Sequence, residues 1–309
     1  MLPLRLNSHE VNRMSSVQVT SLAKLNLLLA ITGKREDGYH NLMSVVSQVS
    51  LADEISVTLT PKAFSLSCNV GEVPVDESNL ILKAAVLFKQ LTGYTGGAHF
   101  DLKKEIPMGA GLGGGSSNAV AAIRALEALT GIKIDVTQLQ QKVATIGSDC
   151  TLFLSQKACM MQGRGERIQV LPDSVQARIK GKRVVIYKPD FGISTAWAYK
   201  RMTELTDAYL RADKAEALVK VWVDNPAAPI EDLLYNNMQK PAFLKFPSLV
   251  VVAESLHKNY GLKVLMSGSG SACFALLPDK DGPSDAELSN TIRGLLGDST
   301  FVRIATLVG

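Results

Sequence analysis

Cysteine is sparse in this chain, and the few cysteines are far apart. They are Cys68, Cys150, Cys159 and Cys273, with no C-x-x-C pair and no histidines at the intervals of a zinc site. This spacing argues against a disulfide framework and against structural zinc. We therefore expect free thiols and a reducing, cytoplasmic location.

Long apolar runs are missing as well. Stretches such as residues 25–31 fall far short of the roughly 20 residues that a membrane-spanning helix needs. The first fifteen residues carry charged side chains and no continuous apolar core, so they do not resemble a secretory signal. We expect residues 1–16 to form a loose N-terminal extension.

Charge of one sign is not in excess. The 33 basic and 29 acidic side chains leave a net charge of +4. A protein that binds a nucleic-acid backbone normally shows a strong basic stripe, and none is visible in this sequence. We therefore expect neither a nucleic acid nor a membrane as partner.

The length of 309 residues allows two ordinary domains, and 46% of the residues are apolar. Predicted helices and strands are mixed without a regular β-α-β alternation. This order favours an α+β fold with mixed or antiparallel sheets over a parallel doubly wound sheet. A polar stretch over 173–182 precedes a predicted strand, so we expect an N-terminal domain over 17–182 and a C-terminal domain over 183–309.

Local patterns predict the main elements. Apolar residues alternate over 21–31, which predicts a strand with Lys24 and Asn26 on one face. Two short strands, 55–59 and 64–68, are expected to pair antiparallel. Further helices are expected over 79–91, 116–130, 137–145, 194–205, 210–221, 247–258 and 286–296, and further strands over 99–106, 184–187, 264–266, 273–277 and 301–308.

The strongest motif is PMGAGLGGGSSN, residues 107–118. Glycine occupies five of the seven positions from 109 to 115, and a predicted serine-capped helix follows directly. Glycine permits positive φ angles and close backbone approach, and the first N–H groups of a helix lack acceptors within it. Both features suit a bound phosphate group.

Two well-known phosphate loops fit this motif less well. Gly109, Gly111 and Gly114 satisfy G-x-G-x-x-G, and Asp135 follows about 20 residues later, as in NAD-dependent dehydrogenases. A proline separates the preceding strand from the loop, however, and no β-α-β alternation follows. A Walker A loop would need Lys-Ser/Thr after the glycines. The loop must therefore take its cationic partner from elsewhere in the chain.

The glycine motif resembles the ATP-binding loop of the GHMP kinases, which phosphorylate small metabolites such as galactose, homoserine and mevalonate. SLAKLNLLLAITGKREDGYHNL, residues 21–42, is similar to the N-terminal motif of one member that acts on a cytidylyl alcohol. MSGSGSACFAL, residues 266–276, resembles the C-terminal glycine loop of the family. The resemblance extends from about residue 17 to the C-terminus and implies a two-domain α+β fold with the active site in the cleft between domains.

The resemblance implies transfer of the γ-phosphoryl group of ATP, with Mg²⁺, to a hydroxyl of a small cytidylyl substrate in non-mevalonate isoprenoid synthesis. Lys24 and Asp149 hold the places of the family's active-site lysine and aspartate. Asp149 would accept the hydroxyl proton, and Lys24 would supply the charge that the glycine loop lacks. From the residues alone, Asp149 is equally suited to cap a short helix, whereas a surface lysine is the less favoured alternative for Lys24.

The resemblance also assigns binding residues. Those for ATP are Asn79, Lys104, Pro107, Met108, Gly109, Ala110, Gly111, Leu112, Gly113, Gly114, Gly115, Ser116 and Ser117, with Ser116 or Ser117 as the Mg²⁺ ligand. Those for the substrate are Asn26, Tyr39, His40, Lys188, Thr195, Tyr199, Gly268 and Gly270. A cytosine ring would stack between Tyr39 and Tyr199, although core packing is the alternative for Tyr199.

Other functions remain open at this stage. One is a GHMP kinase for another small alcohol, and one is a nucleotide-binding sensor without phosphoryl transfer. The presence of both Lys24 and Asp149 argues against the sensor, which would need neither. An NAD-dependent dehydrogenase is the alternative based on the glycine spacing. We expect a monomer or a weak homodimer.

Overall fold

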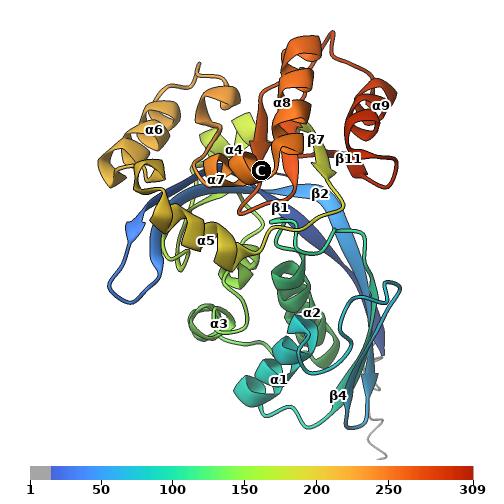
Figure 1. Cartoon of the computed structure of the whole chain (residues 1–309). Helices are drawn as coiled ribbons and strands as arrows, with labels where there is room; N and C mark the ends of the chain where they lie inside the picture. Colours follow the sequence, from blue (N-terminus) through green and yellow to red (C-terminus); the bar gives the residue numbers. More distant parts are fainter. Residues whose placement is uncertain (1–14, 309) are drawn as a thin grey trace, which may run out of the picture.

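A computed structural model describes residues 15–308 and contains two β-sheets with helices packed around them (Figure 1). Most of the N-terminal extension expected over residues 1–16 lies outside the described residues. No helix within the described part of the chain combines the length and apolar character that a membrane crossing requires.

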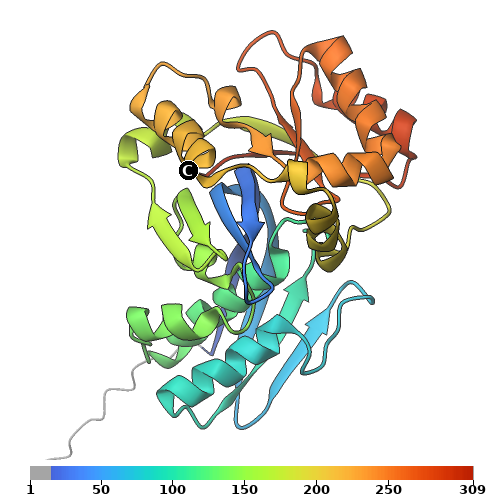
Figure 2. The same cartoon turned by 60° about the vertical axis from the view of Figure 1, so that its left-hand side comes forward.

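The first sheet has seven strands and is built around a long hairpin. Its strands are β1 (Ser16–Lys34), β2 (His40–Thr60), β3 (Phe64–Cys68), β4 (Gly97–Lys103), β5 (Cys159–Gly163), β6 (Arg167–Val170) and β8 (Tyr235–Asn236). The order is β3-β4-β2-β1-β8, and the β5–β6 hairpin joins through β2. Register shifts in the β1–β2 pair mark bulges, which increase the local twist. The hairpin stands between the N-terminal helices and the C-terminal helices in both views (Figures 1 and 2).

The antiparallel pairing expected between residues 55–59 and 64–68 is wrong, because β4 lies between these two strands. β2 pairs antiparallel with β4, whereas β3 pairs parallel with β4 after a crossover through α1 (Leu80–Thr92). Glycine at 97 allows β4 to lie this close to the start of β3, because a Cβ atom at that position would be only 2.1 Å from the Ala63 carbonyl oxygen. Nothing in the alternation of apolar residues distinguishes a neighbouring strand from one placed two positions away.

Helices α1, α2 (Gly114–Thr130) and α3 (Val136–Val143) pack on this sheet through one apolar cluster. The expected helix ends are confirmed: Asn79 accepts from the backbone N–H of Ile81, and Gly93 and Gly131 end their helices in the left-handed conformation. The expected serine cap of α2 is wrong. Its N-cap is Gly113, with φ of 72°, because the loop turns into the helix in a conformation that favours glycine.

The second sheet is antiparallel, in the order β11-β7-β10-β9. Its strands are β7 (Arg183–Lys188), β9 (Val264–Met266), β10 (Cys273–Leu276) and β11 (Phe301–Thr306). The helices around it are α4 (Asp173–Ile179), α5 (Thr195–Glu204), α6 (Ala212–Asp224), α7 (Gln239–Lys245), α8 (Pro247–Tyr260) and α9 (Asp285–Leu296). The helices expected over 194–205, 210–221, 247–258 and 286–296 are confirmed. The sequence patterns do not predict helices α4 and α7.

The two sheets share one hydrophobic cluster, which includes Leu27 and Val45 from the first sheet and Ile186 and Phe274 from the second. Strand β8 adds a further link, since its residues pair parallel with β1 although they come from the C-terminal half. The α+β fold class with mixed and antiparallel sheets is confirmed. The long β1–β2 hairpin thereby reaches from the N-terminal helices to the C-terminal helices, and the candidate site lies along it.

Candidate active site

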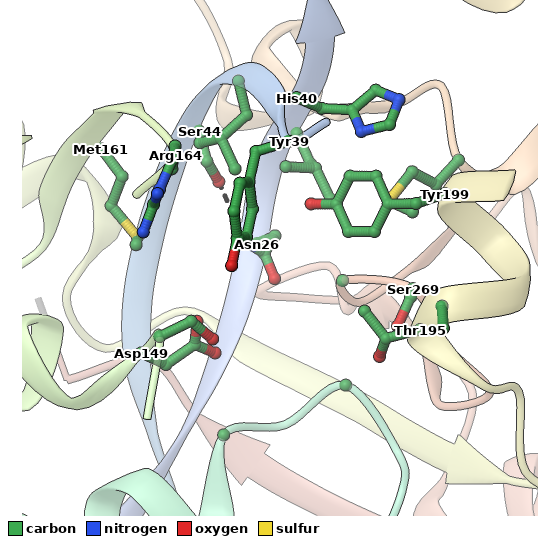
Figure 3. A pocket seen from close by; sticks show the side chains of 18 of the residues that line it. Asn26, Tyr39, His40, Ser44, Asp149, Met161, Arg164, Thr195, Tyr199 and Ser269 are labelled. Atoms are coloured by element: carbon green, nitrogen blue, oxygen red, sulfur yellow. Dashed lines mark hydrogen bonds between the residues drawn. The ribbon is translucent and has the colours of Figure 1, made fainter. Parts of the chain in front are cut away.

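A cavity of about 740 Å³ lies where the β1–β2 hairpin, the glycine loop after β4, the start of α5 and the loop after β9 come together (Figure 3). Many of the residues expected at the site line this one cavity. They are Lys24, Asn26, Tyr39, His40, Gly111, Gly113, Asp149, Thr195, Tyr199 and Gly268. Segments far apart in the sequence thus contribute to a single space.

Lys24 is buried on β1, with only 5% of its surface exposed. Its Nζ donates to Asn26 Oδ1, and Asn26 Nδ2 in turn donates to Ser44 Oγ over 2.9 Å. Lys24 and Asn26 share a face of the strand, as the alternation predicts. A surface lysine is therefore excluded for Lys24.

Asp149 lies at the beginning of the short 3-10 helix η1 (Cys150–Leu154), and its Oδ2 is 3.7 Å from Lys24 Nζ. Its side chain makes no capping hydrogen bond to that helix, and 31% of it is exposed to the cavity side. The structure therefore gives no support to capping as the function of this carboxylate. The arrangement leaves carboxylate oxygens available to a hydroxyl group in the cavity.

Burial lowers the pKa of Lys24 below the usual value for lysine, and the attraction of Asp149 opposes that shift. Burial disfavours a charged ammonium because little water remains to solvate it. The carboxylate beside Lys24 compensates for part of this cost. Asp149 therefore helps to keep the buried Lys24 in its charged form.

The glycine loop is held against this pair by its backbone. The N–H of Lys24 donates to the Leu112 carbonyl over 2.9 Å, and Ser267 Oγ donates to the Gly111 carbonyl over 3.0 Å. Gly111 has φ of 75°, and a Cβ atom there would lie 2.2 Å from the Ser267 carbonyl oxygen. The two glycine-rich loops of the sequence therefore touch, at a distance that excludes a side chain.

The two serines at the start of α2 have different surroundings. Ser117 Oγ is buried and lies 2.7 Å from Ser21 Oγ, so it is directed towards β1. Ser116 is half-buried, and a Cβ atom at Gly147 would lie 2.9 Å from its Oγ. Glycine at 147 thus leaves space beside the Ser116 hydroxyl, an oxygen donor of the kind that Mg²⁺ accepts. No cluster of three acidic, histidine or cysteine side chains suited to a metal is found within residues 15–308.

Aromatic side chains gather at the other end of the cavity (Figure 3). Tyr39 is exposed, and its ring lies across the cavity from that of Tyr199. The His40 ring packs on Tyr199 with centroids 4.9 Å apart, and His40 Nε2 lies 3.1 Å from the Tyr209 hydroxyl. Burial, with a smaller contribution from Asp149, raises the pKa of Tyr199 to about 12. A flat heterocycle placed between Tyr39 and Tyr199 would therefore meet neutral aromatic faces and the polar edge of His40.

The structure places some predicted residues elsewhere. Lys104, Pro107, Met108 and Lys188 line a second cavity, of about 290 Å³. Lys188 therefore does not face the aromatic end, and its Nζ donates to the Pro189 carbonyl over 2.8 Å. Six further predicted residues do not line the main cavity: Gly109, Ala110, Leu112 and Gly270 lie in the two glycine loops, and Gly114 and Gly115 form the first turn of α2. Asn79 caps α1, and its Nδ2 donates to the Pro74 carbonyl over 2.7 Å.

The structure also adds residues that the sequence did not single out. Ser44 supports Asn26, Tyr209 contacts His40, and Ser269 Oγ lies 3.0 Å from Thr195 Oγ1. Arg164 lines the cavity from the turn between β5 and β6. Ser269 stands in the serine-glycine loop and Arg164 between two glycines, which are local signals. No local feature of the sequence marks Ser44 or Tyr209.

Profiles of known families match both halves of the chain. The GHMP kinases N terminal domain matches residues 79–157, and the GHMP kinases C terminal domain matches residues 215–291. A 4-diphosphocytidyl-2-C-methyl-D-erythritol kinase of Synechococcus sp. (strain CC9605) is 35% identical over 275 residues, which cover 85% of this chain and 88% of that protein. The chain belongs to the GHMP kinase family.

Two further comparisons agree. The kinase of the same name from Methylacidiphilum infernorum (isolate V4) is 35% identical over 284 residues, covering 91% of this chain and 93% of that protein. A crystal structure of 4-(cytidine 5'-diphospho)-2C-methyl-D-erythritol kinase has 31% identity and a TM-score of 0.75, covering 95% of this chain and all of that one. The Methanococcus jannaschii mevalonate kinase, at 13% identity and a TM-score of 0.70, shows the shared fold.

As a GHMP kinase, the chain is an ATP-dependent phosphotransferase that acts on a small molecule. The dehydrogenase alternative is wrong. Its glycine spacing occurs in a loop that connects β4 to α2, and β4 pairs antiparallel with β2 and parallel with β3 in a mixed sheet that is not doubly wound. The G-x-G-x-x-G match therefore arises from the local density of glycines.

Proposed function

We propose that this kinase transfers the γ-phosphoryl group of ATP to the 2-hydroxyl of 4-diphosphocytidyl-2-C-methyl-D-erythritol, a step in non-mevalonate isoprenoid precursor synthesis. One observation carries the proposal: a single cavity holds the Lys24–Asp149 pair at one end and the Tyr39, His40 and Tyr199 rings at the other. The names of the similar proteins from Synechococcus and Methylacidiphilum support this substrate.

Asp149 is the catalytic base in this proposal. Its carboxylate orients the substrate hydroxyl and accepts the proton as the oxygen attacks the γ-phosphorus. Lys24 Nζ, 3.7 Å from Asp149 Oδ2, stabilises negative charge that develops between the attacking oxygen and the phosphoryl group. Burial of Lys24 strengthens this effect because water screens the charge less.

The glycine loop holds the phosphates of ATP. The backbone N–H groups at the start of α2 lack acceptors within the helix and lie at the positive end of its dipole. Ser116 would hold Mg²⁺, which neutralises phosphate charge when bound. Ser117 is the less suitable of the two serines for Mg²⁺, because its hydroxyl accepts a hydrogen bond from Ser21 on β1. We propose that Ser117 instead helps to fix the start of α2 against β1.

The aromatic end selects the substrate. A cytosine ring between Tyr39 and Tyr199 would gain about 1–3 kcal/mol from each stacked face. Asn26, Thr195 and Gly268 line the space between this end and Asp149. The diphosphate and the erythritol chain of the substrate would span that distance. Lys188 is not part of this proposal, since it faces the second cavity.

Three predictions from the sequence are proposals beside this function: the domain boundary, the location and the assembly. The domain boundary at residues 182–183 fits the two sheets, apart from β8, which joins the first sheet. A cytoplasmic location is suggested by four free thiols, three of them buried. A monomer or weak homodimer is the assembly that we propose.

Release of ADP tests the proposed substrate. Purified protein with Mg-ATP is given 4-diphosphocytidyl-2-C-methyl-D-erythritol, homoserine, mevalonate or galactose in separate reactions. We expect ADP only with the cytidylyl substrate, and competition by cytidine. Turnover of another alcohol without competition by cytidine would establish the alternative GHMP kinase. Binding of ATP without turnover of any alcohol would establish the sensor.

A further inference from the structure

Arg164 is a cavity residue to which the proposed function gives no role. It stands at the turn between β5 and β6, and its guanidinium lies over the Tyr39 ring, with Cζ 4.0 Å from the ring centroid. In Figure 3 the Tyr39 ring lies between Arg164 on one side and Tyr199 on the other. One face of Tyr39 is thus covered by a cation, and the other is turned towards the cavity.

The fold fixes Arg164 at this position. Gly163 pairs with Leu42 in the β2–β5 register, so the turn that follows reaches the level of Tyr39 at the start of β2. Gly163 and Gly165 have φ of 73° and 109°, which lets the chain reverse tightly on both sides of the arginine. Glu166 Oε2 accepts from the Arg164 backbone N–H over 2.6 Å and stabilises the turn.

The Arg164 guanidinium is near enough to Asp37 to act on it electrostatically, but the two side chains form no ion pair, since Asp37 pairs with Arg35. Within residues 15–308, no carboxylate lies within 4.0 Å of the Arg164 guanidinium nitrogens, and its side chain makes no hydrogen bond there. The guanidinium lies instead on the face of Tyr39, an arrangement in which the positive charge meets the electron-rich side of the ring.

The other hydrogen bonds and ion pairs of the loop that carries Tyr39 involve the Tyr39 backbone and the side chains of Arg35 and Asp37, and they do not reach the Tyr39 ring. The Tyr39 N–H donates to Asp37 Oδ1 over 3.1 Å, and Arg35 Nη2 lies 3.1 Å from Asp37 Oδ2. Tyr39 as a residue is 56% exposed, so few neighbours restrict the rotation of its side chain. A freely rotating ring must be ordered each time that a ligand stacks on it, which weakens binding.

We infer that Arg164 is a positioning residue for pyrimidine recognition: it holds the Tyr39 ring from the outer face, so that the inner face stays parallel to the entering base. This inference rests on the proposed function, because it requires a base between Tyr39 and Tyr199. Arg164 acts through Tyr39 and need not touch the substrate. A guanidinium can also bind phosphate directly, and the experiment separates these two roles.

The test compares Arg164→Ala with Arg167→Ala. Arg167 is an exposed arginine on the same β5–β6 hairpin, and it does not line the cavity. Arg167→Ala therefore removes the same charge as Arg164→Ala without changing the cavity. Binding of cytidine and of CMP is measured by calorimetry, and KM is measured for the cytidylyl substrate and for ATP. Cytidine lacks the phosphate and therefore reports only on the stacking site.

For Arg164→Ala we expect weaker binding of cytidine and CMP by the same factor, about 3-fold to 10-fold. KM for the cytidylyl substrate should rise, and KM for ATP should not. Arg167→Ala should leave all four values unchanged. In a Tyr39→Leu background, the further change Arg164→Ala should have no effect on cytidine, because the ring through which it acts is gone.

Three results would overturn the inference while leaving the proposed function intact. They are unchanged cytidine binding in Arg164→Ala, a loss confined to CMP, and a loss that persists in the Tyr39→Leu background. The second would make Arg164 a phosphate ligand. If the unaltered protein binds neither cytidine nor CMP, the proposed function itself fails, and the inference fails with it.

Discussion

Lys24 on β1 and Asp149 at the start of η1 are far apart in the sequence, yet their Nζ and Oδ2 atoms lie 3.7 Å apart at the wall of the main cavity. The glycine loop brings them together, because Leu112 accepts a hydrogen bond from the Lys24 backbone and Phe153 of η1 lies against Gly113. The proposed reacting pair and the proposed phosphate loop are therefore one structural unit.

Asp149→Asn tests the catalytic base. The amide keeps the size of the side chain but cannot accept a proton, so we expect turnover to fall by about 10² or more while ATP still binds. Single-turnover transfer and calorimetric ATP binding measure the two effects. Asp173→Asn, at an exposed position, serves as the control and should react normally. Turnover of Asp149→Asn at the unaltered rate would exclude this base.

We expect His40 to give the substrate affinity a pH dependence. Burial and the nearby Lys34 lower the pKa of His40 below its usual value of 6.5, so the ring is neutral at neutral pH. Cytidine affinity should therefore be constant around neutral pH and fall only as acid protonates the ring. Calorimetry across pH measures this, and His40→Gln should remove the acid limb. An acid limb centred above pH 6.5 would speak against the assignment.

Gly111→Ala tests the contact between the two glycine loops. The added Cβ atom would meet the Ser267 carbonyl oxygen at 2.2 Å, in a backbone conformation that already disfavours alanine. Gly131→Ala is the matched control, because its φ of 72° is similar and no atom lies within 4 Å. Denaturant unfolding should show a larger loss for Gly111→Ala, by about 1–3 kcal/mol. Equal losses would mean that the loops do not need this contact.

Lys104 is predicted from the resemblance to contact ATP, but its Nζ lies 2.7 Å from Asp53 Oδ2, and the Asp53 side chain is fully buried. Asp53 Oδ1 also accepts from the Ile106 N–H over 2.7 Å at the entrance to the glycine loop. Lys104→Met should lower the free energy of unfolding by about 3 kcal/mol, because it leaves a buried charge without its partner. Lys103→Met, on the exposed neighbour, should leave the melting temperature nearly unchanged. A loss of ATP affinity without a loss of stability in Lys104→Met would instead indicate direct contact.

Much of the fold could be predicted because its signals are local. Periodicity and caps place α1 from Asn79 to Gly93, and a glycine marks the end of α2. The pairing of β3 depends on where β4 returns after α1, and that information is not contained in either strand. Helices α4 and α7 are short, so their periodicity covers too few residues to be distinct.

The residues of the candidate site likewise divide into those with a local signal in the sequence and those placed by distant parts of the chain. Lys24, the glycine loop and Tyr39 stand in segments whose composition is unusual, and the sequence singles them out. Tyr209 reaches His40 only because the chain after α5 passes beside β2, and a single tyrosine carries no local sign of that. Lys188 lies near Thr195 in sequence, but the end of β7 directs it to the second cavity.

Transfer of label from γ-labelled ATP to 4-diphosphocytidyl-2-C-methyl-D-erythritol tests the central claim most directly. The reaction is run with the unaltered protein and with Lys24→Ala and Asp149→Ala, after calorimetry has shown that each variant binds ATP. We expect label on the substrate 2-hydroxyl with the unaltered protein, and at least a hundredfold less with either variant. Undiminished transfer in either variant, or no labelled product with the unaltered protein, would contradict the central claim.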